Sequence, residues 1–225
     1  ILNAPAKDYP DLNPSHIDGK TGWLALQQLV LPEQTGRLAG YGLYRQVIKD
    51  KSGYSSVDDW AWAVLNAFDT FRVLSPLRGG VYGVEGLNQR IEQWLGQSST
   101  SQAWYQGRPV MVTSNDYGLG LMNGDIGIAL QDQNNKLRVA FPAADQQIHW
   151  VSPLRLPNVE TAYAMTVHKS QGSEFSHVVL VLPEQISQVL TRELIYTGIT
   201  RAKLDFTLLE SGIGVLEQAV GASCR

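Results

Sequence analysis

The chain has few of the features that mark secreted or membrane proteins. It carries one cysteine, Cys224, among 225 residues, so no intrachain disulfide can form. It has no run of eighteen or more apolar residues, and it opens without the charged and apolar stretches of a secretory signal. The composition therefore predicts a protein of a reducing, cytoplasmic setting that has no place in a membrane.

Charge is also scarce, and neither sign dominates. Charged residues make up 17% of the chain and the net charge is −3 at pH 7, whereas proteins that clamp duplex nucleic acid by charge alone are usually basic. A basic groove shared between two domains would not show in this total. The hydrophobic content of 44% is typical of a globular protein, and 225 residues suffice for one domain or two.

Regular patterns begin after an amino-terminal stretch rich in proline and glycine. We predict an irregular segment over residues 1–36, interrupted by a short helix or strand at 23–31. Apolar residues at helical spacing then predict amphipathic helices at 37–50 and 57–70.

The most regular pattern lies in the last third of the chain. An alternating apolar run over 162–167 leads into a polar loop, 168–174, and a second run of Val and Leu follows over 177–182. Apolar residues recur at helical spacing over 191–203, and 205–210 has the composition of a last strand. The order of strand, loop, strand, helix and strand predicts a parallel α/β sheet with helices on both faces.

The loop 168–174 is a candidate binding site. It leaves the carboxyl end of a predicted strand, which is the edge where ligands bind in parallel sheets. It carries hydroxyls, an amide, a cation and a carboxylate, and its Gly172 permits a close backbone approach or a positive φ. We therefore interpret the loop as a site and not as a mere connection.

Residues 105–157 have a different character. Short β runs, spaced about ten residues apart, alternate with turn signals such as Asn-Gly and Asn-Asn. This pattern predicts a small antiparallel barrel over 105–157, with the segments 37–104 and 158–225 on either side of it. A glycine-rich turn before the predicted helix at 84–95 suits anion binding, but it fits neither standard phosphate fingerprint.

Two of these stretches resemble motifs of superfamily 1 helicases. MTVHKSQGSEF, at 165–175, is similar to motif V, and LIYTGITRA, at 194–202, is similar to motif VI. Their spelling resembles the RecD (alpha) subunits of exodeoxyribonuclease V, a bacterial recombination enzyme. The stretches 74–95 and 105–130 extend the resemblance, which spans about 39–209.

The resemblance implies that 37–104 and 158–225 together form a RecA-like sheet domain, into which the barrel is inserted as an SH3-like subdomain. It also implies a 5′–3′ DNA helicase subunit that acts in recombinational double-strand-break repair. It implies ATP and Mg²⁺ in the intact enzyme. The chain contains no GxxxxGK(S/T) phosphate loop and no paired acidic motif after a strand, so we expect a missing amino-terminal RecA-like domain to supply them. The implied partners are that domain, single-stranded DNA and the other subunits of exodeoxyribonuclease V. We expect the isolated chain to bind no cofactor and to hydrolyse no ATP.

The resemblance also assigns roles to individual residues. Arg201 is implied to be a catalytic arginine finger that neutralises charge on the γ-phosphate; the alternative is a cation favoured at a helix carboxyl end. The implied nucleotide-binding residues are Arg78, Gln171, Gly172, Glu174 and Thr200. The implied DNA-binding residues are Thr166, His168, Lys169 and Ser170. No set of His, Cys and carboxylate residues has metal-ligand spacing, so we predict no metal site.

Simpler interpretations stay open. Arg78 can be a solvated loop cation, Glu174 a carboxylate that caps backbone amides, and His168 a partly buried histidine. The loop 115–125 is implied to line a path for single-stranded DNA, or it is a structural Ω-type loop. The whole chain can also belong to a stand-alone RecD-like or plasmid helicase, or to a non-enzymatic module whose barrel recruits a partner.

Overall fold

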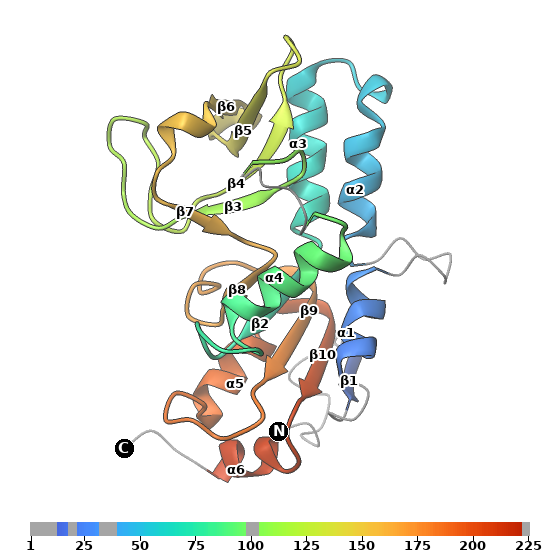
Figure 1. Ribbon diagram of the computed structural model, residues 1–225, viewed down its shortest axis with the longest axis vertical. Helices are drawn as coiled ribbons and strands as arrows, with labels where there is room; N and C mark the ends of the chain where they lie inside the picture. Colours follow the sequence, from blue (N-terminus) through green and yellow to red (C-terminus); the bar gives the residue numbers. More distant parts are fainter. Residues whose placement is uncertain (1–12, 18–21, 32–39, 98–103, 222–225) are drawn as a thin grey trace.

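The computed structural model describes residues 13–17, 22–31, 40–97 and 104–221. It contains two five-stranded β-sheets, which lie one above the other along the long axis of the molecule (Figure 1). The lower sheet is parallel and the upper sheet is antiparallel.

The parallel sheet has the strand order β1-β10-β9-β2-β8. Its strands are β1 (Asn13–Ile17), β2 (Phe71–Ser75), β8 (Ala164–Thr166), β9 (Phe175–Leu182) and β10 (Ala202–Glu210). All of these pairs are parallel, and β9 lies at the centre with every one of its last five residues buried. The predicted parallel α/β sheet is confirmed.

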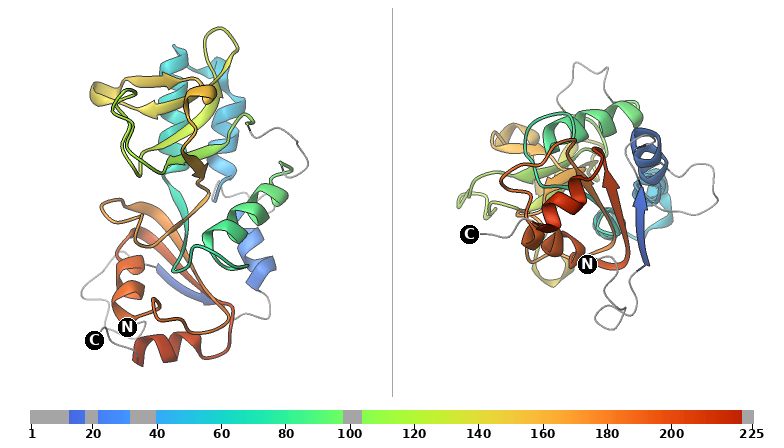
Figure 2. Two further views of the ribbon diagram at one scale, coloured as in Figure 1. Left: turned by 60° about the vertical axis from the view of Figure 1, so that its left-hand side comes forward. Right: turned by 90° about the horizontal axis from the view of Figure 1, so that it is seen from below.

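Helices cover both faces of the parallel sheet (Figure 2). One face carries α1 (Gly22–Val30) and α4 (Val84–Trp94), and the other carries α5 (Arg192–Ile199) and α6 (Val215–Gly221). The side chains of β9 divide between two apolar cores, because successive residues of a strand point to opposite faces. The run of Val and Leu is therefore buried on both sides, as is usual for a central parallel strand.

The antiparallel sheet has the order β6-β5-β4-β3-β7. Its strands are β3 (Pro109–Val112), β4 (Ile126–Gln131), β5 (Leu137–Pro142), β6 (Ile148–Val151) and β7 (Val159–Thr161), with two short 3₁₀ turns at Ala144–Gln146 and Pro153–Arg155. The predicted antiparallel strands are confirmed. Among the described residues β6 and β7 are the two ends of this pairing, so the strands form a sheet whose closure into a barrel is not seen.

Two helices that we assigned to the sheet domain pack elsewhere. The helices α2 (Gly42–Lys49) and α3 (Val57–Phe68) lie beside the antiparallel sheet, and α3 contacts β4, β5 and β6 (Figure 1). The side chain of Ser56 accepts a hydrogen bond from the Asp59 backbone N–H at 3.0 Å and so begins α3. The fully buried Trp60 lies on the packed face. Periodicity predicted both helices but could not show which sheet would bury them.

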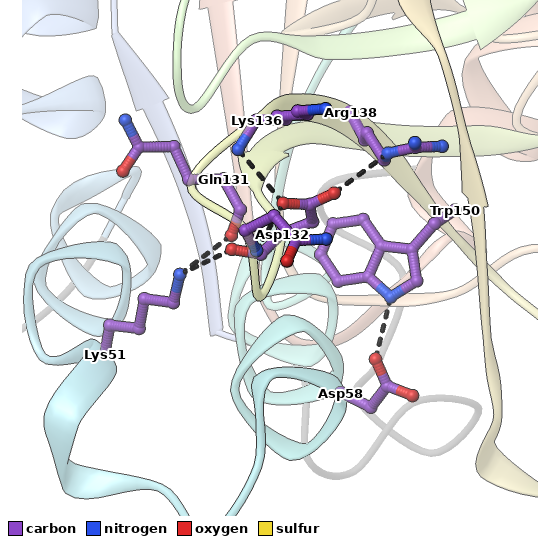
Figure 3. A network of polar contacts seen from close by, with 8 residues as sticks. Lys51, Asp58, Gln131, Asp132, Lys136, Arg138 and Trp150 are labelled. Atoms are coloured by element: carbon purple, nitrogen blue, oxygen red, sulfur yellow. Dashed lines mark hydrogen bonds and ion pairs between the residues drawn. The ribbon is translucent and has the colours of Figure 1, made fainter.

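Polar contacts hold these helices to the antiparallel sheet (Figure 3). Lys51, in the 3₁₀ turn Lys51–Gly53, donates through Nζ to the carbonyl oxygen of Asp132 at 3.0 Å. The Asp132 carboxylate accepts a hydrogen bond from Arg138 Nε at 2.9 Å, and backbone N–H groups of its own turn lower the pKa of that carboxyl. Trp150 Nε1 donates to Asp58 at 2.7 Å. The α2–α3 hairpin and the sheet therefore form one unit.

The prediction of an irregular amino-terminal segment over 1–36 was wrong at β1, whereas the short helix or strand expected at 23–31 is confirmed as α1. β1 extends the parallel sheet beyond β10, and α1 buries Leu26 and Val30 completely. The sequence of β1, NPSHI, lacks apolar alternation, and its ladder partner lies almost two hundred positions away. The remainder of that segment, apart from residue 31, lies outside the described residues.

His177 on β9 gives the fold a pH dependence. Its Nε2 lies 2.9 Å from the Thr207 hydroxyl, and burial lowers the pKa of the imidazole below its usual 6.5. The unfolded chain then binds more protons than the folded one, so this contribution is fully present above pH 6.5 and is lost as the pH falls below it.

We expect His177→Gln to flatten the pH dependence of the unfolding free energy between pH 7 and about 5.5, measured by urea denaturation. His149→Gln, at an exposed position on β6, is the matched control and should keep the wild-type slope. Equal slopes for wild type and His177→Gln would contradict this assignment.

Candidate functional site

The loop after β8 runs from the carboxyl-terminal end of the parallel strands to their amino-terminal end. β8 ends at Thr166 and β9 begins at Phe175, and both strands pair in parallel with β2. The loop therefore starts at the carboxyl end of one strand and finishes at the amino end of the other. Only its first part lies at the edge where we expected the site.

Hydrogen bonds within the loop use the hydroxyls that we assigned to DNA. Ser170 is 0% exposed, and its Oγ donates to the Val167 carbonyl at 2.7 Å. A phosphate oxygen only accepts hydrogen bonds, and the single O–H of Ser170 is already given to the backbone. The structure therefore does not support a side-chain contact from Ser170 to DNA. The hydroxyl oxygen of Thr166, which is half-buried, accepts the backbone N–H of Lys169 at 3.2 Å.

The other two predicted DNA contacts are accessible. His168 is exposed, which excludes its alternative interpretation as a partly buried histidine. Lys169 Nζ donates to Asn123 Oδ1 at 3.2 Å and so bridges to the loop 115–125 of the antiparallel sheet. Sequence reasoning missed Asn123 because its contact joins positions 46 residues apart, in loops that leave two different sheets.

The loop 115–125 is anchored from below and presents an aromatic ring to solvent. Leu119 and Leu121 are buried in the core of the antiparallel sheet. The Asn123 backbone N–H donates to the Asn115 side chain at 2.8 Å, which closes the loop. Tyr117 is 80% exposed, so its ring is available for contact with a ligand.

Arg201 lies against the far end of the loop 168–174. It follows α5 and precedes β10, and its carbonyl oxygen accepts the Phe175 N–H at 2.8 Å. Its guanidinium donates to the Ser173 carbonyl at 3.2 Å, to the Thr197 carbonyl at 3.3 Å and to the Thr200 hydroxyl at 3.2 Å. An arginine has five N–H donors, so two remain beyond these three contacts. The structure therefore brings Arg201 together with the loop, as predicted.

The predicted nucleotide-binding residues of the loop are exposed. Gly172 has a φ of +86°, and an added Cβ would meet nothing within 4 Å, so its backbone conformation and not its surroundings favours glycine. Glu174 lies 3.7 Å from Lys203 Nζ. Gln171 and His168 line a shallow open depression of about 340 Å³ between the loop and α5.

Arg78 lies apart from this group. It follows the carboxyl end of β2, and its guanidinium forms ion pairs with Glu160 at 2.9 Å and with Glu85 at 3.6 Å. The side chain is 66% exposed, so it is a solvated cation that two carboxylates hold. No contact recorded among the described residues joins Arg78 to Arg201 or to the loop 168–174. Sequence reasoning missed Glu160, which enters from β7.

A buried arginine, also missed, supports the start of β9. Arg72 is 0% exposed and donates to Asp69 at 2.8 Å and to the Ala162 carbonyl at 3.0 Å. Its guanidinium lies 4.1 Å from the ring of Phe68 and 4.8 Å from the ring of Phe175. Arg72 thus connects the end of α3 to Phe175, the first residue of β9, whose backbone N–H donates to the Arg201 carbonyl.

The described residues contain no group of three or more His, Cys, Asp or Glu side chains that could hold a metal ion. Mg²⁺ bound to a nucleotide needs only one or two protein carboxylates beside the phosphates, so this absence concerns sites that the protein builds by itself. In the same part of the chain, no helix has the length and apolar character needed to cross a membrane.

Three strands of the parallel sheet, the polar loop and the arginine after α5 fall within the match to a helicase family model. The family model described as UvrD-like helicase C-terminal domain matches residues 161–209, which run from the end of β7 to β10. The match covers less than a quarter of the chain, and that part resembles a helicase carboxyl-terminal domain.

Several curated proteins that match this chain are RecD subunits. The RecBCD enzyme subunit RecD of Haemophilus influenzae is 42% identical over 165 residues, which are 71% of this chain and 24% of that protein. RecD of Mycolicibacterium smegmatis is 42% identical over 142 residues, 62% of this chain and 25% of that protein. The predicted resemblance to the carboxyl-terminal region of RecD is thereby confirmed. The chain spans about a quarter of the length of these relatives.

Two other comparisons are weaker. The ATP-dependent RecD2 DNA helicase of Deinococcus radiodurans is 35% identical over 137 residues, 59% of this chain and 19% of that protein. A solved structure of Bacteroides Pif1 bound to single-stranded DNA aligns with a TM-score of 0.42 at 16% identity, covering 79% of this chain and 50% of that one.

Proposed function

We propose that this chain is the carboxyl-terminal part of an ATP-dependent 5′–3′ DNA helicase of the RecD type. In this proposal it forms the second wall of an ATP cleft and part of the path for single-stranded DNA. The observation that carries the proposal is the contact of Arg201 with the Ser173 carbonyl at 3.2 Å, because it joins an available cation to an exposed polar loop. The similarity to RecD subunits supports it.

The proposed nucleotide-facing group centres on Arg201. Phosphoryl transfer depends on positioning and on neutralising the charge that develops at the γ-phosphate. The two N–H groups of Arg201 that remain can donate to a phosphate presented by an amino-terminal RecA-like domain. Exposed Gln171, Gly172 and Glu174 would face the same nucleotide, and Arg78 would leave its two carboxylates and approach the nucleotide from the loop after β2 on closure. Mg²⁺ would neutralise phosphate charge from outside the described residues.

The proposed DNA-facing group combines two loops. Lys169, His168 and Thr166 would contact phosphates, which position a strand without reading its sequence. Asn123 places the loop 115–125 beside them, and the exposed ring of Tyr117 can stack on a base. We propose that the antiparallel sheet is an SH3-like subdomain and that this loop lines the DNA path.

The loop 168–174 would couple the nucleotide-facing group to the DNA-facing group. Its first half carries Lys169, and its second half carries the Ser173 carbonyl that Arg201 binds. If domain closure turns Arg201 toward a phosphate, the loop must shift, and its grip on DNA changes with the nucleotide state. Alternation of tight and weak grip would move the protein along the strand.

We expect Lys169→Ala in the full-length protein to weaken single-stranded DNA binding at every sequence tested. The slope of log Kd against log salt concentration should fall by about 0.7, because one phosphate contact is lost. Lys136→Ala, an exposed cation on the β4–β5 turn, is the control and should leave the slope unchanged. An unchanged slope for Lys169→Ala, or an equal loss for both variants, would contradict the proposed DNA path.

We propose that the full protein works in recombinational double-strand-break repair with the other subunits of an exodeoxyribonuclease V complex. The chain contains no phosphate loop, so the isolated 225 residues should hydrolyse no ATP. The similarity to RecD2 favours a stand-alone RecD-like helicase as the second candidate. Co-purification of the tagged full-length protein with large nuclease and helicase subunits would support the complex, and a DNA-unwinding monomer would support the second candidate.

A further inference from the structure

We infer that Thr200 is a positioning residue for Arg201 and not a nucleotide ligand; this inference rests on the function proposed for Arg201. Thr200 caps the carboxyl end of α5 with a φ of −69° and a ψ of −2°. Its hydroxyl donates to the Thr197 carbonyl at 2.9 Å and accepts from Arg201 Nη2 at 3.2 Å. Its backbone N–H donates to the Tyr196 carbonyl at 3.0 Å.

The hydrogen-bonding capacity of Thr200 decides between the two roles. A threonine hydroxyl has one donor and two acceptor sites, and the donor is already given to the Thr197 carbonyl. Phosphate oxygens at neutral pH accept hydrogen bonds and donate few. Both donors of Thr200, the hydroxyl O–H and the backbone N–H, therefore already bind carbonyls of α5 and cannot donate to a phosphate. The hydroxyl oxygen can still accept, which suits the N–H of a guanidinium.

The contacts of Arg201 share a chemical property that fits this role. Its three acceptors, the Ser173 and Thr197 carbonyls and the Thr200 hydroxyl, are all neutral oxygens. Arg78, in contrast, is held by two carboxylates that offset its charge. Neutral acceptors orient the guanidinium of Arg201 and leave its positive charge to act on a developing negative charge.

Thr200 is the one side chain among these three acceptors. The other two are backbone carbonyls, which a substitution cannot remove. Thr200 also fixes the Nη2 nitrogen, so it sets the plane of the guanidinium and the direction of the two N–H groups that remain. Loss of its hydroxyl should loosen that plane while the nucleotide contacts themselves persist.

The test compares Thr200→Val with Thr200→Ser in steady-state ATP hydrolysis by the full-length protein. We expect Thr200→Val, which lacks the hydroxyl, to lower kcat about tenfold with KM for ATP within about twofold. Thr200→Ser should restore kcat to near the wild-type value. Should the valine variant fail to fold, Thr200→Ala supplies the same comparison against serine.

Thr70→Val is the matched control. The Thr70 hydroxyl donates to the Ala67 carbonyl at 2.8 Å just beyond α3, which is the same three-residue contact that Thr200 makes at α5. Within the part of the chain that the structure describes, no arginine N–H donates to the Thr70 hydroxyl. Thr70→Val should leave kcat unchanged.

The outcomes separate this inference from the proposed function. A normal kcat in Thr200→Val, together with a large loss in Arg201→Ala, would overturn the positioning role and keep the function proposed for Arg201. A raised KM with an unchanged kcat would overturn it in favour of a nucleotide ligand. Normal turnover in Arg201→Ala would overturn both.

Discussion

Replacing Arg201 with alanine in the full-length protein is expected to lower ATP turnover by about a thousandfold. The loss follows because an arginine presented to the γ-phosphate stabilises charge that exists only in the transition state, in a site from which water is largely excluded. The affinity for single-stranded DNA should change by less than about threefold, because the DNA-facing side chains lie on the other half of the loop.

Two further variants sharpen this experiment. Arg201→Lys keeps the charge but loses the planar fork, and one ammonium cannot bind the three acceptors and a phosphate together, so we expect a loss of about a hundredfold. Arg192→Ala removes an exposed arginine from the first turn of the same helix and should leave turnover unchanged. Equal effects at positions 201 and 192 would argue for a general loss of charge and against a finger. Unchanged ATP turnover in Arg201→Ala would favour the alternative of a non-enzymatic module whose barrel recruits a partner.

Gly83→Ala is expected to reduce the unfolding free energy by about 3 kcal/mol or more, as measured by chemical denaturation. Gly83 precedes α4 with an ordinary φ of −82°, so strain in φ is not the cause. A Cβ at this position would lie 2.1 Å from the Gly79 carbonyl oxygen, a backbone atom that cannot move aside without opening the turn. The turn follows Arg78 directly, so the ion pairs of Arg78 with Glu85 and Glu160 should be lost as well.

Gly80→Ala is the matched control within the same turn. Gly80 has a φ of +89° and nothing within 4 Å of an added Cβ, so the substitution costs only backbone conformational energy, about 1–2 kcal/mol. The larger effect should therefore appear at the glycine with the ordinary φ. Equal losses at both positions, or a smaller loss at Gly83, would contradict the close approach of Gly79 and Gly83.

Local periodicity predicted most of the elements that position the site. The Val and Leu run became β9 and the helical pattern at 57–70 became α3. Most of the segment 191–203 became α5, but its last two residues belong to β10. The motif spelling brought Arg201 and the loop 168–174 into one region, and their contact through Ser173 is seen.

What sequence could not supply were contacts between distant segments. The ion pair of Arg78 with Glu160 and the bond from Lys169 to Asn123 join separate sheets, and no spacing rule connects such positions. The burial of Ser170 was equally hidden, because a serine in a polar loop can point either way until the turn is formed.

The central claim is that Arg201 acts on the γ-phosphate while the loop beside it holds DNA. The most direct test is a crystal structure of the full-length protein with ADP, aluminium fluoride and single-stranded DNA. We predict an Arg201 guanidinium nitrogen within about 3 Å of the fluoride and Lys169 beside the DNA backbone. A guanidinium that stays more than about 6 Å from the fluoride in the closed complex would contradict the claim.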